Sequence, residues 1–264
     1  MLENPRSPRV RAVAKLRKKQ ERTASGLFLL EGPQSVAEAL GFRPHLLVEM
    51  YATPTAFERH LEVAEAAMEV GVGIEFVSEG VLEAMADTVT PQGFVAVCRQ
   101  FPTAVKEIFA ASPTLIVVLE EVRDPGNAGT IVRAADAAGA DAVIFTGRSV
   151  DLYNPKLVRS TTGSIFHLPI AVDVELSDVV ARAREAGLTV LAADLSGEEL
   201  TTVLPLLKRP TAWVFGNEAR GLSPEHSVLC DHAVRVPIYG HAESMNLATA
   251  ASVCVYQSAF AQRI

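Results

Sequence analysis

The sequence predicts an α/β protein with two domains, the second of which has a parallel sheet with helices on both of its faces. Three observations lead to this prediction: the length of 264 residues, the 49% of hydrophobic residues, and short apolar runs that alternate with helix-like stretches. A chain of this length forms one large domain or two of ordinary size, and its apolar residues supply a core. The composition therefore indicates a folded protein.

The start of the chain is strongly basic, although the whole protein has a formal net charge of −7. The negative total argues against a protein that holds nucleic acid by bulk positive charge. Between Arg6 and Arg22, only Glu21 opposes the basic residues. Two interpretations stay open, a phosphate-contacting arm and a solvated helix face or frayed tail. The residues of this basic leader are Arg9, Arg11, Lys15, Arg17, Lys18 and Lys19.

The first domain is expected over residues 1–105 as a small α/β domain. Pro33–Leu40 and Thr55–Val70 have helical spacing of apolar residues, and Thr55 is placed to cap the second helix. The segment Phe101–Pro113 contains two prolines that interrupt the pattern, so we expect a linker there. Short apolar runs predict strands at Phe28–Leu30, Leu46–Met50, Ile74–Val77 and Phe94–Cys98.

The second domain is expected over residues 113–264, where the strands become more uniformly apolar. Continuous apolar runs separated by helices are typical of strands that are buried on both faces of a parallel sheet. A final helix is expected from Asn246 to Phe260, with apolar residues at helical spacing. The predicted strands are Leu115–Leu119, Ala142–Phe145, Leu188–Ala193, Ala212–Phe215 and Ala233–Val236.

The cysteines and the hydropathy pattern predict neither a metal site nor a membrane segment. Cys98, Cys230 and Cys254 are far apart and form no CxxC pair or cluster with histidines, so buried thiols are expected. The sequence has no run of about 18 uncharged apolar residues. Its first residues are basic and polar, unlike a secretory signal. A cytoplasmic location is the resulting expectation.

Three glycine-rich segments follow predicted strands of the second domain, where open α/β sheets bind ligands. The first, Asp124–Arg133, leads into a helix whose N-terminus offers free amides to an anion. Arg133, about one turn inside that helix, can direct a planar guanidinium to the same point. This segment lacks GxGxxG and the chain lacks GxxxxGK[ST], which argues against dinucleotide and P-loop sites.

The second and third segments are Phe215–Ser223 and Val236–Leu247. In the second, Gly216 permits close approach of another backbone or a ligand, and Glu218 is two residues from the oppositely charged Arg220. This pattern fits either a site or a turn with an internal ion pair. In the third, Ser244 and Asn246 precede the final helix, where each by itself predicts an N-cap.

Together, the three segments resemble the signature motifs of the SpoU (TrmH-like) branch of the SPOUT methyltransferases over residues 113–264. The first hundred residues resemble, more loosely, a ribosomal-protein-like RNA-binding domain, with Leu29–Gly32 as its opening strand and turn. Met245 and Leu247 replace the usual leucine and valine, and both keep similar apolar bulk. The matching positions are Asn127, Gly129 and Arg133, then Gly216, Glu218 and Gly221–Ser223, then Pro237, Ser244 and Asn246.

The resemblance implies a C-terminal trefoil knot and S-adenosylmethionine held among the knot loops. It also implies homodimers in which the arginine of one subunit faces the cofactor of the other. The final helix, apolar at Leu247, Ala251, Val255 and Ala259, suits such an interface or packing within one subunit. The implied cofactor-binding positions are Leu195, Gly216, Val236, Ile238, Met245 and Leu247.

The resemblance selects Arg133 for catalysis. Because a guanidinium has a pKa above about 12, we interpret Arg133 as holding a phosphate and stabilising alkoxide charge, not as a base. Glu218 is the candidate for orienting it, and Asn127, Ser244 and Asn246 would fix the ribose and the motif geometry.

The expected function is S-adenosylmethionine-dependent 2′-O-ribose methylation of RNA, and the expected substrate is large-subunit (23S) ribosomal RNA. A transfer RNA substrate and a non-catalytic RNA-binding α/β protein are the alternatives. A nucleotide-dependent enzyme of small molecules is disfavoured by the missing phosphate fingerprints.

Overall fold

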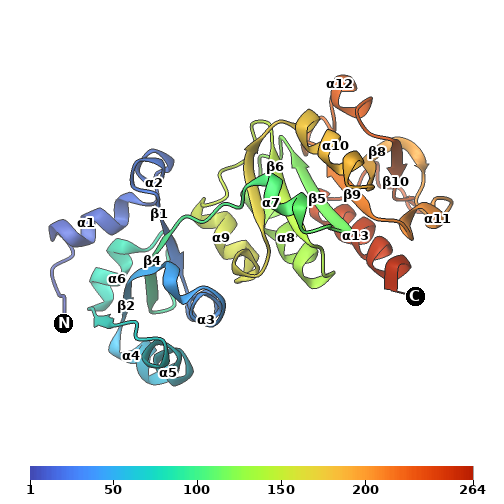
Figure 1. Ribbon diagram of the computed structural model, residues 1–264. Helices are drawn as coiled ribbons and strands as arrows, with labels where there is room; N and C mark the ends of the chain where they lie inside the picture. The colour runs from blue at the N-terminus through green and yellow to red at the C-terminus, as the bar shows by residue number, and fades with distance from the viewer. Residues whose placement is uncertain (264) are drawn as a thin grey trace. The chain divides into compact units, whose positions relative to one another are not determined.

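The computed structural model describes residues 1–263, which form two compact units (Figure 1). The first unit consists of Met1–Phe101 and Tyr153–His167. The second consists of Pro102–Leu152 and the chain from Leu168 onward. The segment Tyr153–His167 falls inside the range 113–264 of the predicted second domain, yet it packs with the first unit.

The first unit contains a four-stranded sheet in the order β1-β4-β2-β3. The central strand β4 is antiparallel to β1 and β2, whereas β3 is parallel to β2. All four strands predicted for this part of the chain are confirmed, with small shifts at their ends. Their bounds are Leu27–Glu31 (β1), Leu47–Ala52 (β2), Ile74–Phe76 (β3) and Phe94–Arg99 (β4).

One predicted helix of this unit, Thr55–Val70, is wrong in its extent. The structure has two helices, Pro54–Arg59 (α4) and Leu61–Glu69 (α5), which are separated at His60. Thr53, not Thr55, caps the first of them, because Pro54 takes the first helical position and the Thr53 hydroxyl accepts from the Ala56 amide at 3.3 Å. The other helices are Pro8–Lys15 (α1), Lys19–Ser25 (α2), Pro33–Phe42 (α3), Pro44–Leu46 (η1), Glu79–Met85 (α6), Pro155–Thr161 (α9) and Ser164–Phe166 (η2).

The segment Tyr153–His167 is bound to the first unit by an ion pair and an aromatic cluster. Arg159 donates to the buried carboxylate of Glu31 at 2.8 Å and to Asp87 at 2.9 Å. The Tyr153 ring lies 4.8 Å from that of Phe28, which is fully buried. Because a buried carboxylate is costly without a partner, Arg159 is part of what keeps β1 in place.

The second unit is built on a six-stranded, entirely parallel sheet in the order β10-β8-β9-β5-β6-β7, as the sequence predicts. Sequence patterns missed β7, which pairs with β6 at the edge of the sheet and is partly exposed over its last three residues. It therefore lacks the continuous apolar run of a central strand. The bounds are Leu115–Glu120 (β5), Ala142–Thr146 (β6), Ile170–Val174 (β7), Thr189–Glu199 (β8), Thr211–Phe215 (β9) and His232–Arg235 (β10).

Helices cover both faces of this sheet. On one face, Ile108 and Val179 of α7 and α10 pack against Ile116 and Val190. Helices α8 and α13 pack against each other and against the opposite face (Figure 1). The expected linker is wrong in part, because α7 forms between its two prolines with Ile108 buried. The helices are Val105–Ala110 (α7), Pro125–Ala137 (α8), Leu176–Glu185 (α10), Leu204–Leu207 (α11), Pro224–Ser227 (α12) and Leu247–Arg263 (α13).

The inner face of α13 packs within the subunit. Ala251, Val255 and Ala259 are buried there, so these positions are not available to a second subunit. The Trp213 indole N–H donates to the buried Ser258 hydroxyl at 2.8 Å, which fixes α13 on β9. No helix among residues 1–263 has both the length and the apolar character needed to cross a bilayer.

Candidate active site

The motif segments leave the carboxyl ends of three strands of the parallel sheet. β5 leads into α8, β9 leads into the segment 216–223, and β10 leads into the segment 236–246. Because parallel strands end at the same edge, the three segments meet there.

The first motif begins inside a helix and not in a loop. The Asp124 carboxylate caps α8 by accepting from the Asn127 amide at 2.8 Å, and Pro125 takes the first helical position. Asn127 and Gly129 are therefore helical, and Arg133 lies about two turns from the start of α8 instead of the predicted one.

The second motif is tied to the end of β5 by side chains from both directions. The Glu218 carboxylate accepts from the backbone amides of Arg123 at 3.1 Å and Asp124 at 2.9 Å. Arg220 donates to the Glu121 carboxylate at 2.9 Å, so it pairs with Glu121 and not with Glu218. The two ionic residues of the motif thus hold the second segment against residues 121–124, between β5 and α8.

Glu121 is the strained residue of this contact. Its φ of 53° lies in the left-handed region, which is costly for a residue with a side chain. Asn217 donates to its carbonyl at 2.9 Å, while Arg220 binds its carboxylate. These contacts stabilise the turn that directs the chain from β5 into α8.

The third motif is joined to the first through two asparagines. The Asn246 side-chain oxygen accepts from the amides of Ala248 at 2.9 Å and Thr249 at 3.3 Å, which caps α13. Its amide group donates to the Asn127 side-chain oxygen at 3.0 Å. One side chain therefore connects the N-terminal ends of α8 and α13.

A cavity of about 370 Å³ opens between the second and third segments, β8 and α13. Its volume is in the range of small-molecule and cofactor sites. Apolar side chains from β8, β10 and α13 form much of the lining, together with the polar groups of residues 217–221. Ser244 also lines it and is exposed. The predicted cofactor-binding residues that line it are Leu195, Val236, Ile238, Met245 and Leu247.

Comparison with known families matches two separate ranges of the chain. The SpoU rRNA Methylase family matches residues 114–256, and the MRM3-like substrate binding domain matches residues 7–96. The chain belongs to the SpoU rRNA methylase family.

Individual relatives cover almost the whole of this SpoU methylase. The Bacillus subtilis protein named 23S rRNA (guanosine(2553)-2′-O)-methyltransferase RlmP is 33% identical over 97% of both chains. The Streptomyces viridochromogenes protein named 23S rRNA (uridine(2479)-2′-O)-methyltransferase is 33% identical over 95% of this chain and 88% of its own.

Two solved structures share the fold of this SpoU methylase and hold AdoMet. The SpoU methyltransferase AviRb from Streptomyces viridochromogenes, in complex with AdoMet, superposes with a TM-score of 0.82, at 28% identity, over 96% of this chain and 98% of its own. The AdoMet-bound rRNA methyltransferase from Sinorhizobium meliloti has a TM-score of 0.81, at 29% identity, over 97% of this chain and 96% of its own.

Gly216, the sixth predicted cofactor-binding residue of this SpoU methylase, does not line the cavity. It is buried, and a Cβ at this position would lie 2.4 Å from the carbonyl carbon of Gly221 and 2.5 Å from the amide nitrogen of Leu222. The glycine is therefore required because the second motif folds back onto its own backbone.

Arg133 of this SpoU methylase is exposed and outside the lining of the cavity. Within residues 1–263 its guanidinium has no hydrogen bond or ion pair, and Glu218 contacts the backbone at residues 123 and 124 instead. Arg123 and Arg220, by contrast, each pair with Glu121. Arg133 is thus an exposed cation of α8 without a partner among residues 1–263.

Sequence reasoning missed a buried carboxylate at this edge. Glu120, the last residue of β5, is 2% exposed and accepts from the Thr146 hydroxyl. His226 of α12 contacts the same carboxylate at 3.1 Å. The only signal in the sequence is the polar pair Glu120–Glu121 after an apolar strand, which resembles any strand end. The contact anchors α12, directly after the second motif.

A cysteine also lines the cavity. Burial raises the pKa of Cys254 to about 12, so this residue is a neutral thiol near pH 7. Among residues 1–263 there is no group of three or more histidine, cysteine or acidic side chains placed to hold a metal ion.

Proposed function

We propose that this chain is an S-adenosylmethionine-dependent RNA 2′-O-ribose methyltransferase that acts on large-subunit (23S) ribosomal RNA. The observation that carries the proposal is the cavity lined by five of the predicted cofactor positions, beside the Asn127–Asn246 contact. Its support includes two relatives named as 23S rRNA 2′-O-methyltransferases and two similar structures with AdoMet. Such a substrate places the enzyme in the cytoplasm.

The cavity fits the cofactor in size and in chemistry. Val236, Ile238 and Leu247 offer an apolar surface for an adenine ring, and half-buried Met245 and exposed Leu195 add apolar side chains to the lining. When bound, S-adenosylmethionine supplies an electrophilic methyl group. The chain segments around the cavity are irregular backbone, whose amides and carbonyls can hydrogen-bond to a polar ligand.

The residues around the cavity have distinct tasks in this proposal. A ribose hydroxyl is a weak nucleophile, so the enzyme must position it and stabilise the charge that develops on its oxygen. Arg133 provides that charge and holds a neighbouring phosphate through its planar fork. The hydrogen bond between Asn246 and Asn127 holds the N-terminal ends of α8 and α13 together. The Ser244 hydroxyl lines the cavity, where it can hydrogen-bond to the ribose.

We infer a homodimer in which the cavity of one subunit faces Arg133 of the partner subunit. Its support is that Arg133 has no partner within residues 1–263 and does not line the cavity of its own chain. Because the inner face of α13 packs within the subunit, the other side of the helix is the one left for a partner. Phe260 lies there, 53% exposed, with its ring 5.5 Å from that of Tyr256.

The test of the function has two measurements. Calorimetry on the purified protein is expected to show S-adenosylmethionine binding without added metal. Mapping of 2′-O-methyl groups in RNA from cells with and without the gene is expected to show one site lost from 23S ribosomal RNA. A lost site in a transfer RNA would move the substrate, and RNA binding without cofactor binding would favour the non-catalytic alternative.

The basic leader divides into two groups in the structure. Arg9 forms ion pairs with Glu49 and Glu75, and its guanidinium lies 5.2 Å from the centre of the Tyr51 ring. Arg17 donates to the carbonyls of Ala84 and Ala86. These two cations are used within the fold, so we propose as RNA contacts the four exposed ones without a partner in residues 1–263: Arg11, Lys15, Lys18 and Lys19.

Changing these four cations to glutamine is expected to weaken RNA binding and to flatten its salt dependence. Each phosphate contact that is lost lowers the slope of log affinity against log salt by roughly 0.7–0.9. The measurement is a salt series of RNA affinities for wild type and variant. The matched control changes Lys106, Lys208 and Arg209, exposed cations of the second unit. Equal slopes for wild type and leader variant would mean that the leader is a solvated surface.

A further inference from the structure

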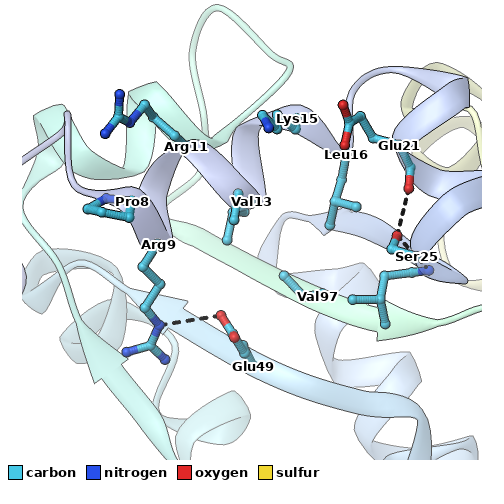
Figure 2. Close-up of a pocket in the computed structure, with 12 residues that line it drawn as sticks. Pro8, Arg9, Arg11, Val13, Lys15, Leu16, Glu21, Ser25, Glu49 and Val97 are labelled. Atoms are coloured by element: carbon cyan, nitrogen blue, oxygen red, sulfur yellow. Dashed lines mark hydrogen bonds and ion pairs between the residues drawn. The ribbon is translucent and has the colours of Figure 1, made fainter.

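The first unit contains a groove that the active site does not use. It lies between α1, α2 and the sheet, and its volume is about 520 Å³ (Figure 2). Apolar side chains form the floor, namely Val13 of α1, Leu16 directly after α1, Leu27 of β1 and Val97 of β4. A flat apolar group is therefore the kind of ligand that the floor accommodates.

One wall of the groove is fixed by charges that are already paired. Figure 2 shows Arg9 directed at Glu49, an ion pair with 3.5 Å between the groups. Burial and the hydrogen bond to Glu49 raise the pKa of Tyr51, so its phenol stays protonated and donates to that carboxylate. These groups give the groove a rigid side, but their hydrogen-bonding capacity is largely used.

Other polar groups around the groove have no partner within residues 1–263. Arg11 and Lys15 lie one helical turn apart along α1, and the Glu21 carboxylate stands on α2 at the other end (Figure 2). A ligand with hydrogen-bond donors for Glu21 and anionic groups for Arg11 and Lys15 satisfies all three. Unpaired bases of RNA have this combination, with phosphates on both sides.

We propose that this groove receives an unpaired nucleobase of the substrate RNA, with Arg11 and Lys15 on the flanking phosphates and Glu21 accepting from the base. The inference rests on the proposed function, because it deepens how that RNA is held. Proteins that read single-stranded RNA take up splayed bases on aromatic rings or guanidinium planes, and here the aliphatic floor of the groove offers an apolar surface to the face of a base. Guanine, adenine and cytosine offer N–H donors on the edge that faces a carboxylate, so a base with an exocyclic amine is preferred over uracil.

The test fills the groove without changing any charge. Ala12 lines the groove and is exposed, so Ala12→Trp occupies its space from α1. Ala24→Trp is the matched control, because Ala24 is exposed on α2 and outside the lining. The probe is a transcript of the 23S ribosomal RNA region that the wild-type protein binds. Ala12→Trp is expected to lower affinity about tenfold with an unchanged salt slope, because one base loses the apolar area that it buries on the floor of the groove, and Ala24→Trp is expected to bind like wild type.

Two outcomes would overturn the groove proposal: equal affinity of Ala12→Trp and wild type, or an equal loss in Ala12→Trp and Ala24→Trp. The first would leave the groove to another class of partner, such as a protein segment. Thermal melts of both tryptophan variants show whether either one is misfolded. The smaller replacement Ala12→Leu fills less of the groove and is expected to lower RNA affinity by an intermediate amount. Absence of methyl transfer by the wild type would overturn the proposed function alone, because the affinity comparison needs no catalysis.

Discussion

Arg133→Ala is expected to lower methyl transfer by about 10²–10³-fold, the range seen when one group that stabilises transition-state charge is removed. Cofactor binding should stay near the wild-type value, because Arg133 does not line the cavity. Arg133→Lys should restore little, since a point charge lacks the planar fork that holds a phosphate. A radiolabelled-methyl assay beside calorimetry of S-adenosylmethionine binding measures both quantities.

The matched control for Arg133 is Arg209→Ala. Arg209 is an exposed arginine of the same unit, but it precedes β9 and so lies near the opposite edge of the sheet. The Arg209→Ala variant should retain full turnover. Near-normal turnover of Arg133→Ala would remove this residue from the mechanism.

A mixing experiment tests whether Arg133 acts across the dimer. Ala250 lines the cavity, so Ala250→Trp is expected to block the cofactor while leaving Arg133 in place. Subunits with Arg133→Ala and subunits with Ala250→Trp should each be inactive alone. Their mixture regains activity only if the arginine of one subunit serves the cavity of the other, and an inactive mixture that forms heterodimers would contradict this arrangement.

Gly216→Ala is expected to abolish cofactor binding and to destabilise the second unit by about 1–3 kcal/mol, as overpacking does. The added Cβ would lie 2.4 Å from the Gly221 carbonyl carbon, so the segment 217–221 that lines the cavity must move. Thermal unfolding and calorimetry of S-adenosylmethionine binding measure the two effects. A β-branched replacement, Gly216→Val, should lower the thermal stability further than Gly216→Ala does.

Gly240→Ala is the control for Gly216→Ala. Gly240 lies in the third motif segment, its φ is not positive, and an added Cβ would meet no atom within 4 Å. It should melt like wild type. Lost cofactor binding at an unchanged melting temperature in Gly216→Ala would mean that its side chain enters the cavity itself, and unchanged behaviour in both measurements would contradict the close approach.

The buried parallel sheet was predictable because central strands are apolar on both faces, and five of its six strands carry that signal. The edge strand β7 does not, since its outer half is solvated. The split of Thr55–Val70 at His60 was not predictable from periodicity, because apolar spacing continues across the break. Local capping by Thr53 and Pro54 decides where the first of the two helices begins.

Five of the residues that line the cavity were predictable from motif order, whereas the contacts around it were not. The sequence placed Asn127 and Asn246 in different motifs, and the hydrogen bond between them depends on how α8 and α13 meet. In the same way, Glu218 and Arg220 are close in the chain but bind different partners near β5. The basic leader shows the same limit, because Arg9 and Arg17 are bound by residues far away in the sequence. Arg9 pairs with Glu49 and Glu75, and Arg17 donates to the carbonyl of Ala86.

The segment Tyr153–His167 has a consequence for synthesis on the ribosome. A nascent chain that ends at residue 152 has already made β5 and β6, yet Glu31 and Phe28 still lack Arg159 and Tyr153. Although domains generally fold in the order in which they emerge, the first unit here is completed only after a third of the second has been translated. The two units are therefore not separable genetic modules: grafting residues 1–101 alone onto another enzyme would transfer a sheet without its arginine and tyrosine partners.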